Sequence, residues 1–143
     1  MAFRGQYDHS LDAKNRVTVP SKFRAALANG VVLGPGFGTY VTIWPTEGWE
    51  QWTAQQLAPL NPFDQRARDM RHFFSVSYDQ ELDSAGRLAL PPQLIAHAQL
   101  EKDVVVVGVE DHLEIWTRAA WQQHYAALPE TILDTAQDLA SSS

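Results

Sequence analysis

The chain has 143 residues, 45% of them hydrophobic, which suffices for one ordinary domain or two very small ones. It contains no cysteine, and this excludes a disulfide framework and a Cys-ligated zinc site and fits a reducing cytosol. The net charge is −6, yet residues 1–24 hold five Lys and Arg against two Asp, so an acidic body carries a basic N-terminal patch that can bind phosphates.

The first ten residues, MAFRGQYDHS, lack the apolar stretch of a signal peptide, and no run approaches about 18 apolar residues. We therefore expect a soluble, cytoplasmic protein that is not exported and has no membrane partner.

One ten-residue pattern occurs twice: LDAKNRVTVP begins at Leu11 and LDSAGRLALP begins at Leu82. Leucine, aspartate, arginine and proline recur at an offset of 71 (82 − 11). Each copy is typical of a tight polar turn followed by an alternating strand that ends at a proline. The offset becomes 72 further along, where the pair Ile43-Trp44 matches Ile115-Trp116.

In chain order, the first unit is expected to contain several short elements. They are a strand over 3–9, a turn over 12–15, a strand over 17–19, a short helix from Pro20 to about residue 28, strands over 31–33 and 40–44, and a helix N-capped by Thr46. A linking helix follows from Pro62 to about residue 73. The second unit is expected to repeat this order, with strands over 75–78 and 87–90, a helix over 91–98, a hairpin over 104–116 and a helix capped by Thr117.

These elements divide the chain into a first unit (3–60), a linking helix (61–74), a second unit (75–128) and a tail (129–143) that is a weak helix or disordered. One unit of about 45 residues is too small to bury a stable core alone. We therefore expect the two units to pack about a pseudo-two-fold axis, with interleaved strands forming one barrel. The expected fold class is mostly β with short helices (α+β).

On these residues the chain resembles the MraZ family of bacterial transcriptional regulators, part of the AbrB-like swapped-hairpin superfamily. The resemblance rests on FRGQYDHSLDAKNRVTVPSKFR, on LDSAGRLALPPQL and on VVVVGVEDHLEIW, and it covers about the first 125 residues. It implies a double-ψ, swapped-hairpin barrel made from two internal repeats. It also implies a nucleoid-associated repressor that forms homo-oligomeric rings. Such a repressor binds tandem promoter repeats in double-stranded DNA of the division and cell-wall gene cluster, including its own promoter.

The first turn departs from the family pattern, which has glycine before the arginine, as in Gly86 before Arg87. Asn15 stands there in the first copy. Asparagine is the non-glycine residue that best tolerates a left-handed backbone, so we expect the turn to be kept with some strain.

An arginine just past a tight turn projects outward, where its planar fork can bind a phosphate or a guanine edge. We therefore expect Arg16 to be the main DNA contact, with Lys14 and Asn15 on the same turn. Three further cations are expected near this turn if the strand over 3–9 pairs with that over 17–19: Arg4, Lys22 and Arg24.

Arg87 is the weaker candidate, because Ala85 replaces the lysine of the first turn and two carboxylates, Asp79 and Glu81, stand close. Asp12 and Asp83 are expected to accept backbone N–H bonds or to orient the arginines, and with Gly86 they structure the turns. A purely structural turn with a salt bridge remains the alternative for both copies.

No other pattern predicts chemistry. The five histidines lack metal-ligand spacing, no serine has a base and acid partner, and no cofactor motif occurs, so we expect neither an enzyme nor a metal site. The tryptophans are expected to pack the core, and Arg66, Arg68 and Arg71 form a solvated helix face, a subunit contact or a second phosphate patch. The competing functions are a ring-forming assembly or protein-interaction module with DNA binding secondary, and an antitoxin-like module, which predicts one copy and a toxin-binding tail.

Overall fold

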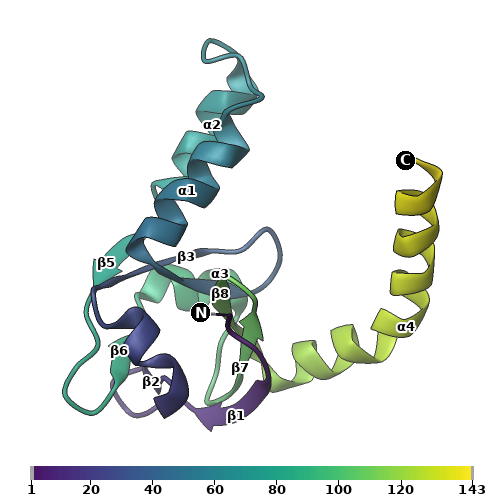
Figure 1. The fold of residues 1–143 in the computed structure, drawn as a ribbon. Helices are drawn as coiled ribbons and strands as arrows, with labels where there is room; N and C mark the ends of the chain where they lie inside the picture. Colours follow the sequence, from purple (N-terminus) through teal and green to yellow (C-terminus); the bar gives the residue numbers. More distant parts are fainter. Residues whose placement is uncertain (1, 143) are drawn as a thin grey trace.

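The computed structural model describes residues 2–142, which form a six-stranded sheet, a separate two-stranded ribbon and four α-helices (Figure 1). The strands are β1 (Gln6–Ser10), β2 (Arg16–Thr18), β3 (Val31–Pro35), β4 (Val41–Pro45), β5 (Tyr78–Gln80), β6 (Arg87–Ala89), β7 (Asp103–Val109) and β8 (His112–Thr117). The helices are α1 (Thr46–Leu57), α2 (Gln65–Phe74), α3 (Pro92–Ala98) and α4 (Arg118–Ser141), with 3-10 turns η1 (Ser21–Phe23) and η2 (Ala25–Leu27).

The large sheet is antiparallel and open, with the order β1-β7-β8-β4-β3-β5, while β2 and β6 pair only with each other. The predicted mixture of strands and helices is thus confirmed, but the expectation of one closed barrel is wrong. The sheet ends at β1 and β5, and the turns that precede β2 and β6 carry these short strands out of it.

Strands of the two sequence units are interleaved in the sheet, with the β7–β8 hairpin of the second unit between β1 and β4 of the first, and matched residues meet at two places. Val17 lies opposite Leu88 in the β2–β6 ribbon, at the offset of 71. Thr42 lies opposite Glu114 where β4 pairs with β8, at the offset of 72. An approximate two-fold axis therefore passes through both pairs.

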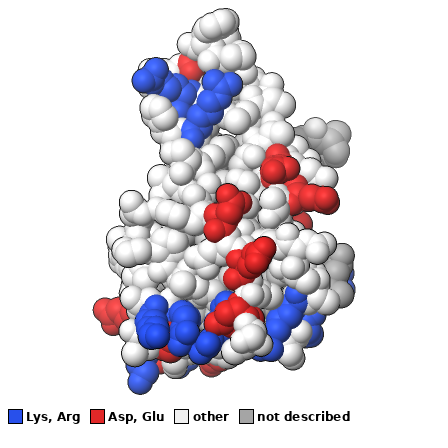
Figure 2. All heavy atoms as spheres, turned by 90° about the vertical axis from the view of Figure 1, so that its left-hand side faces the viewer, with Lys and Arg blue, Asp and Glu red and all other residues white. Residues whose placement is uncertain are grey.

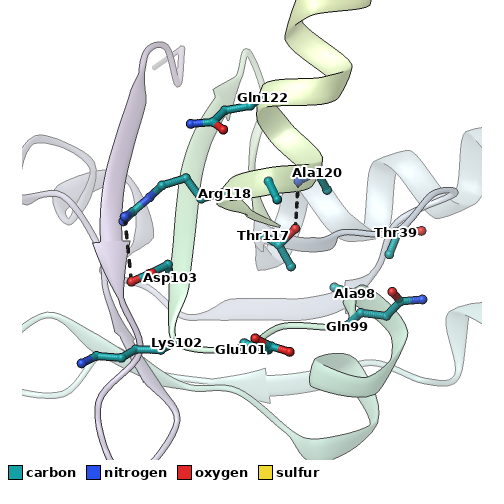
Figure 3. A pocket seen from close by; sticks show the side chains of 11 residues that line it. Thr39, Ala98, Gln99, Glu101, Lys102, Asp103, Thr117, Arg118, Ala120 and Gln122 are labelled. Atoms are coloured by element: carbon teal, nitrogen blue, oxygen red, sulfur yellow. Dashed lines mark hydrogen bonds and ion pairs between the residues drawn. The ribbon is translucent and has the colours of Figure 1, made fainter.

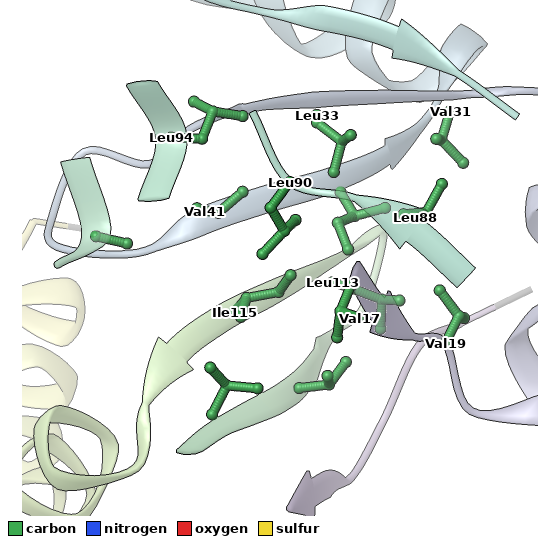
Figure 4. Packing of buried hydrophobic residues seen from close by; sticks show 14 of the residues in the cluster. Val17, Val19, Val31, Leu33, Val41, Leu88, Leu90, Leu94, Leu113 and Ile115 are labelled. Carbon is green, nitrogen blue, oxygen red and sulfur yellow. The ribbon is translucent and has the colours of Figure 1, made fainter. Parts of the chain in front are cut away.

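The main core lies between the inner face of the sheet and the β2–β6 ribbon, with α3 closing one side (Figure 4). Val17 and Leu88 of the ribbon are fully covered by alternate residues of the sheet strands. Figure 4 labels the facing residues: Val31, Leu33, Val41, Leu113 and Ile115. Burial of each such side chain contributes roughly 1.5–3 kcal/mol, so the core fixes which face of the ribbon points outward.

A second, aromatic cluster covers part of the outer face of the sheet under α1 and α2. It contains Val32, Trp44, Trp49 and Phe74, with Trp52 and Phe73 packed against it. The hairpin of α1 and α2 rises from this point, and α4 leaves the body elsewhere on the sheet (Figure 1). No residue of α4 is buried, and the chain after Pro129 continues this helix.

Several local predictions differ from the structure. Thr117 caps α4 as expected, accepting a hydrogen bond from the Ala120 N–H. Thr46 does not cap α1, because Pro45 holds the N-cap position and Thr46 is the first helical residue. The helix expected after Pro20 is only a pair of 3-10 turns, and the real cap of α2 is Asp64, whose carboxylate accepts from the Arg66 N–H.

Candidate nucleic-acid interface

The turn before β2 is organised by the carboxylate of Asp12. One oxygen, Oδ1, accepts the backbone N–H groups of Lys14 and Arg16, each at 2.9 Å. The other, Oδ2, accepts the Arg16 Nε–H at 2.6 Å. A single side chain therefore closes the turn and orients the guanidinium.

The turn before β6 repeats this arrangement around Asp83. Its Oδ1 accepts the N–H groups of Ala85 at 3.0 Å and Arg87 at 2.8 Å, and its Oδ2 accepts the Arg87 Nε–H at 2.8 Å. The backbone is left-handed at the matched positions, with φ 55° at Asn15 and 76° at Gly86. Asparagine thus adopts in the first turn the conformation that glycine adopts in the second.

Each turn is bound to the strand of the other unit. The Asn15 carbonyl accepts the Leu90 N–H at 3.0 Å, and the Gly86 carbonyl accepts the Val19 N–H at 2.9 Å. The ribbon and its turns therefore form one structure to which both sequence units contribute.

Arg16 and Arg87 lie on the same outward face of this ribbon. Arg16 stands opposite Ala89, and Thr18 stands opposite Arg87, while the alternate pair of Val17 and Leu88 faces the core. Diagonal neighbours of this kind have Cα atoms about 7–8 Å apart. The arginine side chains are 27% and 32% exposed. Within residues 2–142 their terminal nitrogens have no partner.

The electrostatics of both turns favour the charged form of the aspartates. The pKa of Asp12 is lowered chiefly by the hydrogen bond from the Arg16 backbone N–H; desolvation opposes this shift, and the Arg16 guanidinium and the Lys14 N–H add to it. The pKa of Asp83 is lowered in the same way by Arg87. Both ion pairs therefore persist well below neutral pH.

Arg24 lies over the second turn, whereas the sequence led us to expect it near the first. Its Nε–H donates to the Val19 carbonyl at 3.0 Å, and a Cβ placed on Gly86 would overlap this nitrogen. The expected pairing of the first strand with residues 17–19 is wrong, because β1 pairs with β7 instead. Glycine at position 86 thus leaves room for the Arg24 side chain beside Arg87.

Two other expected cations do not join the first turn. The Lys22 ammonium lies 4.9 Å from the centre of the Tyr7 ring. Arg4 pairs with Glu110 at 3.5 Å, before the start of β1, and therefore at the opposite end of that strand from the turn.

Lys102 is a neighbour of the first turn that sequence reasoning missed. Its carbonyl accepts the Leu11 N–H at 2.8 Å, and it lines a hollow of about 510 Å³ together with Asp12 and Asn15. Its charge is opposed by Glu101 in the same hollow. No local pattern signals this contact, because it joins residues about 90 positions apart.

Figure 2 shows Lys and Arg side chains gathered at the foot of the molecule, where Figure 1 places β2 and β6, and again near the tip of the α1–α2 hairpin. Asp and Glu side chains lie between the two groups. One of the two basic groups on this face therefore lies at the ribbon end, with some carboxylates among its cations.

A further hollow of about 560 Å³ lies at the start of α4 (Figure 3). Its charges compensate one another: Arg118 lies 3.8 Å from Asp103, and Lys102 and Glu101 share the wall. In the described part of the chain no group of three or more His, Asp or Glu side chains is arranged to hold a metal ion, and no helix is long and apolar enough to cross a membrane.

Comparison with known proteins gives a consistent answer. Residues 2–71 and 73–140 match the model of the MraZ protein family, whose description adds "antitoxin-like". The chain is 36% identical over 140 residues to the transcriptional regulator MraZ of Moorella thermoacetica, covering 92% of this chain and 97% of that protein. It is 39% identical over 123 residues to the transcriptional regulator MraZ of Lachnoclostridium phytofermentans, covering 85% and 86% of the two chains.

Proposed function

Because the chain belongs to the MraZ family, we propose that it is a sequence-specific DNA-binding transcriptional regulator that contacts DNA with the β2–β6 ribbon and its two turns. The observation that carries this proposal is the pair of aspartate-anchored arginines on one outward face of the ribbon. Family membership argues against an enzyme, since the relatives bear the name of a regulator.

The anchoring geometry suits base recognition. In each pair the carboxylate holds Nε, so the two terminal nitrogens stay available as parallel donors. Two parallel N–H donors match the O6 and N7 acceptors of guanine in the major groove, or two oxygens of a phosphate. Because the side chain is already held in place, less rotamer entropy is lost on binding.

The ribbon has the dimensions of a DNA reader. The major groove is about 12 Å wide and admits a two-stranded ribbon, which is the mode of several β-sheet regulators. In this proposal residues 3–60 and 75–128 are two units that each supply one turn. The cross-unit pairing of β2 with β6 also supports the AbrB-like, swapped-hairpin relationship that the resemblance implies.

The two turns are proposed to contribute unequally. Arg16 has Lys14 on its own turn, whereas the second turn has Ala85 at that place and gains Arg24 from the other unit. The Arg24 Nε–H is already bound to a backbone carbonyl, so this cation adds charge but fewer free donors. We therefore assign the larger part of binding to Arg16 and the smaller part to Arg87.

One ribbon is too small to account for a regulator's affinity. Non-specific binding through a few cations has a dissociation constant of about 10⁻⁴–10⁻⁶ M at physiological salt, and specific regulators reach about 10⁻⁸–10⁻¹¹ M. Linking identical ribbons raises avidity by about 10²–10⁴. The proposal therefore includes a homo-oligomer, in the form of a ring, that binds tandem promoter repeats.

The biological context is part of the proposal and is inferred from the family resemblance. We propose that the protein is a nucleoid-associated repressor of the division and cell-wall gene cluster, acting also on its own promoter. A gel-shift assay with the DNA upstream of its own gene, at two salt concentrations and against unrelated DNA of equal length, tests this. Preferential retention of the upstream DNA at the higher salt is expected; equal retention of both DNAs would contradict it.

One observation favours a second candidate, a protein-interaction module with DNA binding secondary. The body of the protein is acidic, and α4 exposes large apolar side chains: Tyr125, Ile132, Leu133 and Leu139. Loss of DNA binding in the Arg16→Ala variant without loss of regulation in cells would favour this candidate over the first.

A further inference from the structure

The outward face of the β2–β6 ribbon carries two uncharged residues beside its two arginines. Thr18 stands opposite Arg87, and Ala89 stands opposite Arg16. Thr18 is half-buried and Ala89 is exposed. Directly opposite side chains in an antiparallel pair have Cβ atoms about 4.5–5.5 Å apart. A duplex held by the arginines therefore also faces these two short side chains.

The arginine side chains leave the middle of this face open. Because β2 and β6 are antiparallel, the turns that precede them stand at opposite ends of the ribbon. Asp12 holds the Nε of Arg16 at 2.6 Å, and Asp83 holds the Nε of Arg87 at 2.8 Å. Each guanidinium is thus drawn toward its own turn, and the space over the opposite strand belongs to the short side chains.

Both short side chains offer a methyl group to the DNA. The side chain of Ala89 is a methyl group, and the Cβ of Thr18 carries a methyl and a hydroxyl group. Thymine is the base that presents a methyl group in the major groove, and alanine and the threonine methyl are suitable partners for it. Threonine is also stiff at its first side-chain torsion, so its methyl group takes few positions. These two places therefore suit thymine.

Short side chains cannot reach far, so their contacts depend on where the backbone is held. The Ala89 N–H donates to Oε1 of Gln80 at 3.2 Å, and its carbonyl accepts from Nε2 of the same side chain at 2.5 Å. Next to Thr18, the Val19 N–H donates to the Gly86 carbonyl at 2.9 Å. Both positions are thus fixed by a neighbouring element before DNA arrives.

The spacing places each thymine close to an arginine-bound base. Successive bases of one strand lie about 3.4 Å apart along the duplex axis. A separation of about 4.5–5.5 Å between opposite side chains therefore corresponds to one or two base steps.

We propose that Thr18 and Ala89 are specificity residues that each contact the 5-methyl group of a thymine. The thymine read by Thr18 lies beside the base bound by Arg87, and that read by Ala89 lies beside the base bound by Arg16. This inference rests on the proposed function, because it requires the ribbon to enter the major groove. It gives the half of the site with the weaker arginine a second means of discrimination.

Deoxyuridine substitution tests the contact on the DNA side. Deoxyuridine pairs with adenine as thymidine does and lacks only the methyl group. Duplexes of the DNA upstream of the gene, with one thymine replaced at a time, are titrated by fluorescence anisotropy. Affinity should fall about two- to tenfold at one thymine in each half of a repeat, as expected for the loss of one buried methyl group. Replacement of the other thymines should leave it unchanged.

Two variants of Thr18 test the contact on the protein side. Thr18→Ser removes the methyl group and keeps the hydroxyl group, so it should bind the thymine and uracil duplexes equally at the position next to the base bound by Arg87. Thr18→Val keeps a methyl group and a branched Cβ, so it should retain the wild-type preference. Ala89→Gly should lose the preference at the other thymine only. Thr131→Ser on the exposed part of α4 is the matched control and should behave as the wild type does.

The outcomes separate this inference from the proposed function. Equal wild-type affinity for thymine and uracil at every position, with binding still lost in Arg16→Ala, would overturn the inference and leave the function standing. A wild-type preference retained in Thr18→Ser would overturn the role of Thr18, since a threonine needed only for the strand does not sense the DNA methyl group. If the wild type does not prefer the upstream DNA at all, the proposed function fails and this inference fails with it. The uracil scan of the wild type needs no variant, so it decides the question even where a substitution destabilises the ribbon.

Discussion

Replacing Arg16 with alanine should abolish most specific DNA binding while leaving the fold intact. The side chain lies on the outward face of the ribbon and is 27% exposed, so its removal leaves no cavity in the core. Asp12 keeps its two backbone hydrogen bonds, from Lys14 and from the residue at position 16, and the turn remains closed. The variant therefore tests recognition with little effect on folding.

The size of the effect follows from the two free guanidinium nitrogens. A bidentate contact to guanine contributes about 1–3 kcal/mol, which is a 5- to 150-fold loss of affinity for one ribbon. Loss of one cationic contact should also lower the salt slope of log K by about one for each ribbon on the DNA. An oligomer that places several ribbons on one operator multiplies both effects.

Fluorescence anisotropy with labelled operator DNA at four salt concentrations measures both quantities. Arg4→Ala is the matched control, since this arginine pairs with Glu110 beyond the far end of β1 and should bind nearly as the wild type does. Wild-type affinity in a folded Arg16→Ala protein, or an equal loss in the Arg4→Ala protein, would refute the assignment of the interface to the ribbon.

Further outcomes follow from the same geometry. Arg87→Ala should weaken binding less than Arg16→Ala, and equal losses in matched titrations would show that the turns contribute equally. Gly86→Ala should lower the unfolding free energy by about 1–2 kcal/mol in denaturant melts, because alanine is strained at φ 76° and its Cβ meets Arg24, whereas Asn15→Gly should be neutral or stabilising. The pKa of Asp12 is lowered on folding, so its contribution to stability is present above the unfolded value of about 3.9 and is lost as pH falls through the folded value. In the Asp12→Asn variant the unfolding free energy should therefore depend less on pH below about pH 4. The same pH dependence as in the wild type would contradict this. Moving one DNA repeat by about half a helical turn, roughly 5 base pairs, should sharply reduce affinity, and indifference to spacing would exclude an assembly that reads one face of the DNA.

The geometry of the two turns could be predicted because it depends on nearby residues. An aspartate at the first position reaches the N–H groups two and four residues later, and the arginine at the fifth position lies within reach of the same carboxylate. Asparagine or glycine at the fourth position supplies the left-handed backbone. The pattern of Asp12, Asn15 and Arg16 thus determines its own local structure.

The surroundings of the turns could not be predicted, because they depend on pairs of residues far apart in the chain. The first strand contains alternating residues that fit many partners, and nothing in it indicates that Gln6 lies opposite Val107. This one pairing decides that Arg4 lies away from the first turn. The place of Arg24 depends in turn on the contact of Val19 with Gly86 across the ribbon.

Whether the sheet is open or closed also depends on residues far apart in the chain and could not be predicted. Two equivalent units predict an approximate two-fold axis, but they do not predict whether the outer strands meet. β1 and β5 are matched by the offset and lie at opposite edges of the sheet, so closing the barrel would require them to pair with each other. Strand β5 has only three residues, so the edge of the sheet that it forms is short.

The two-fold axis has a consequence for recognition. It passes between Val17 and Leu88, on the inner side of the ribbon, and emerges outside between Arg16 and Arg87. A single chain therefore presents to DNA the arrangement that a dimeric regulator presents with two chains, and two-fold symmetry in a protein is mirrored in its site. In the homo-oligomeric ring proposed above, successive copies repeat this footprint in one direction. We accordingly expect each operator repeat to have an approximately palindromic core, and successive repeats to follow one another in direct orientation.

Base substitutions scanned across one repeat should lower affinity at two positions related by inversion, more strongly on the side read by Arg16. A single sensitive position in each repeat would mean that only the first turn reads bases.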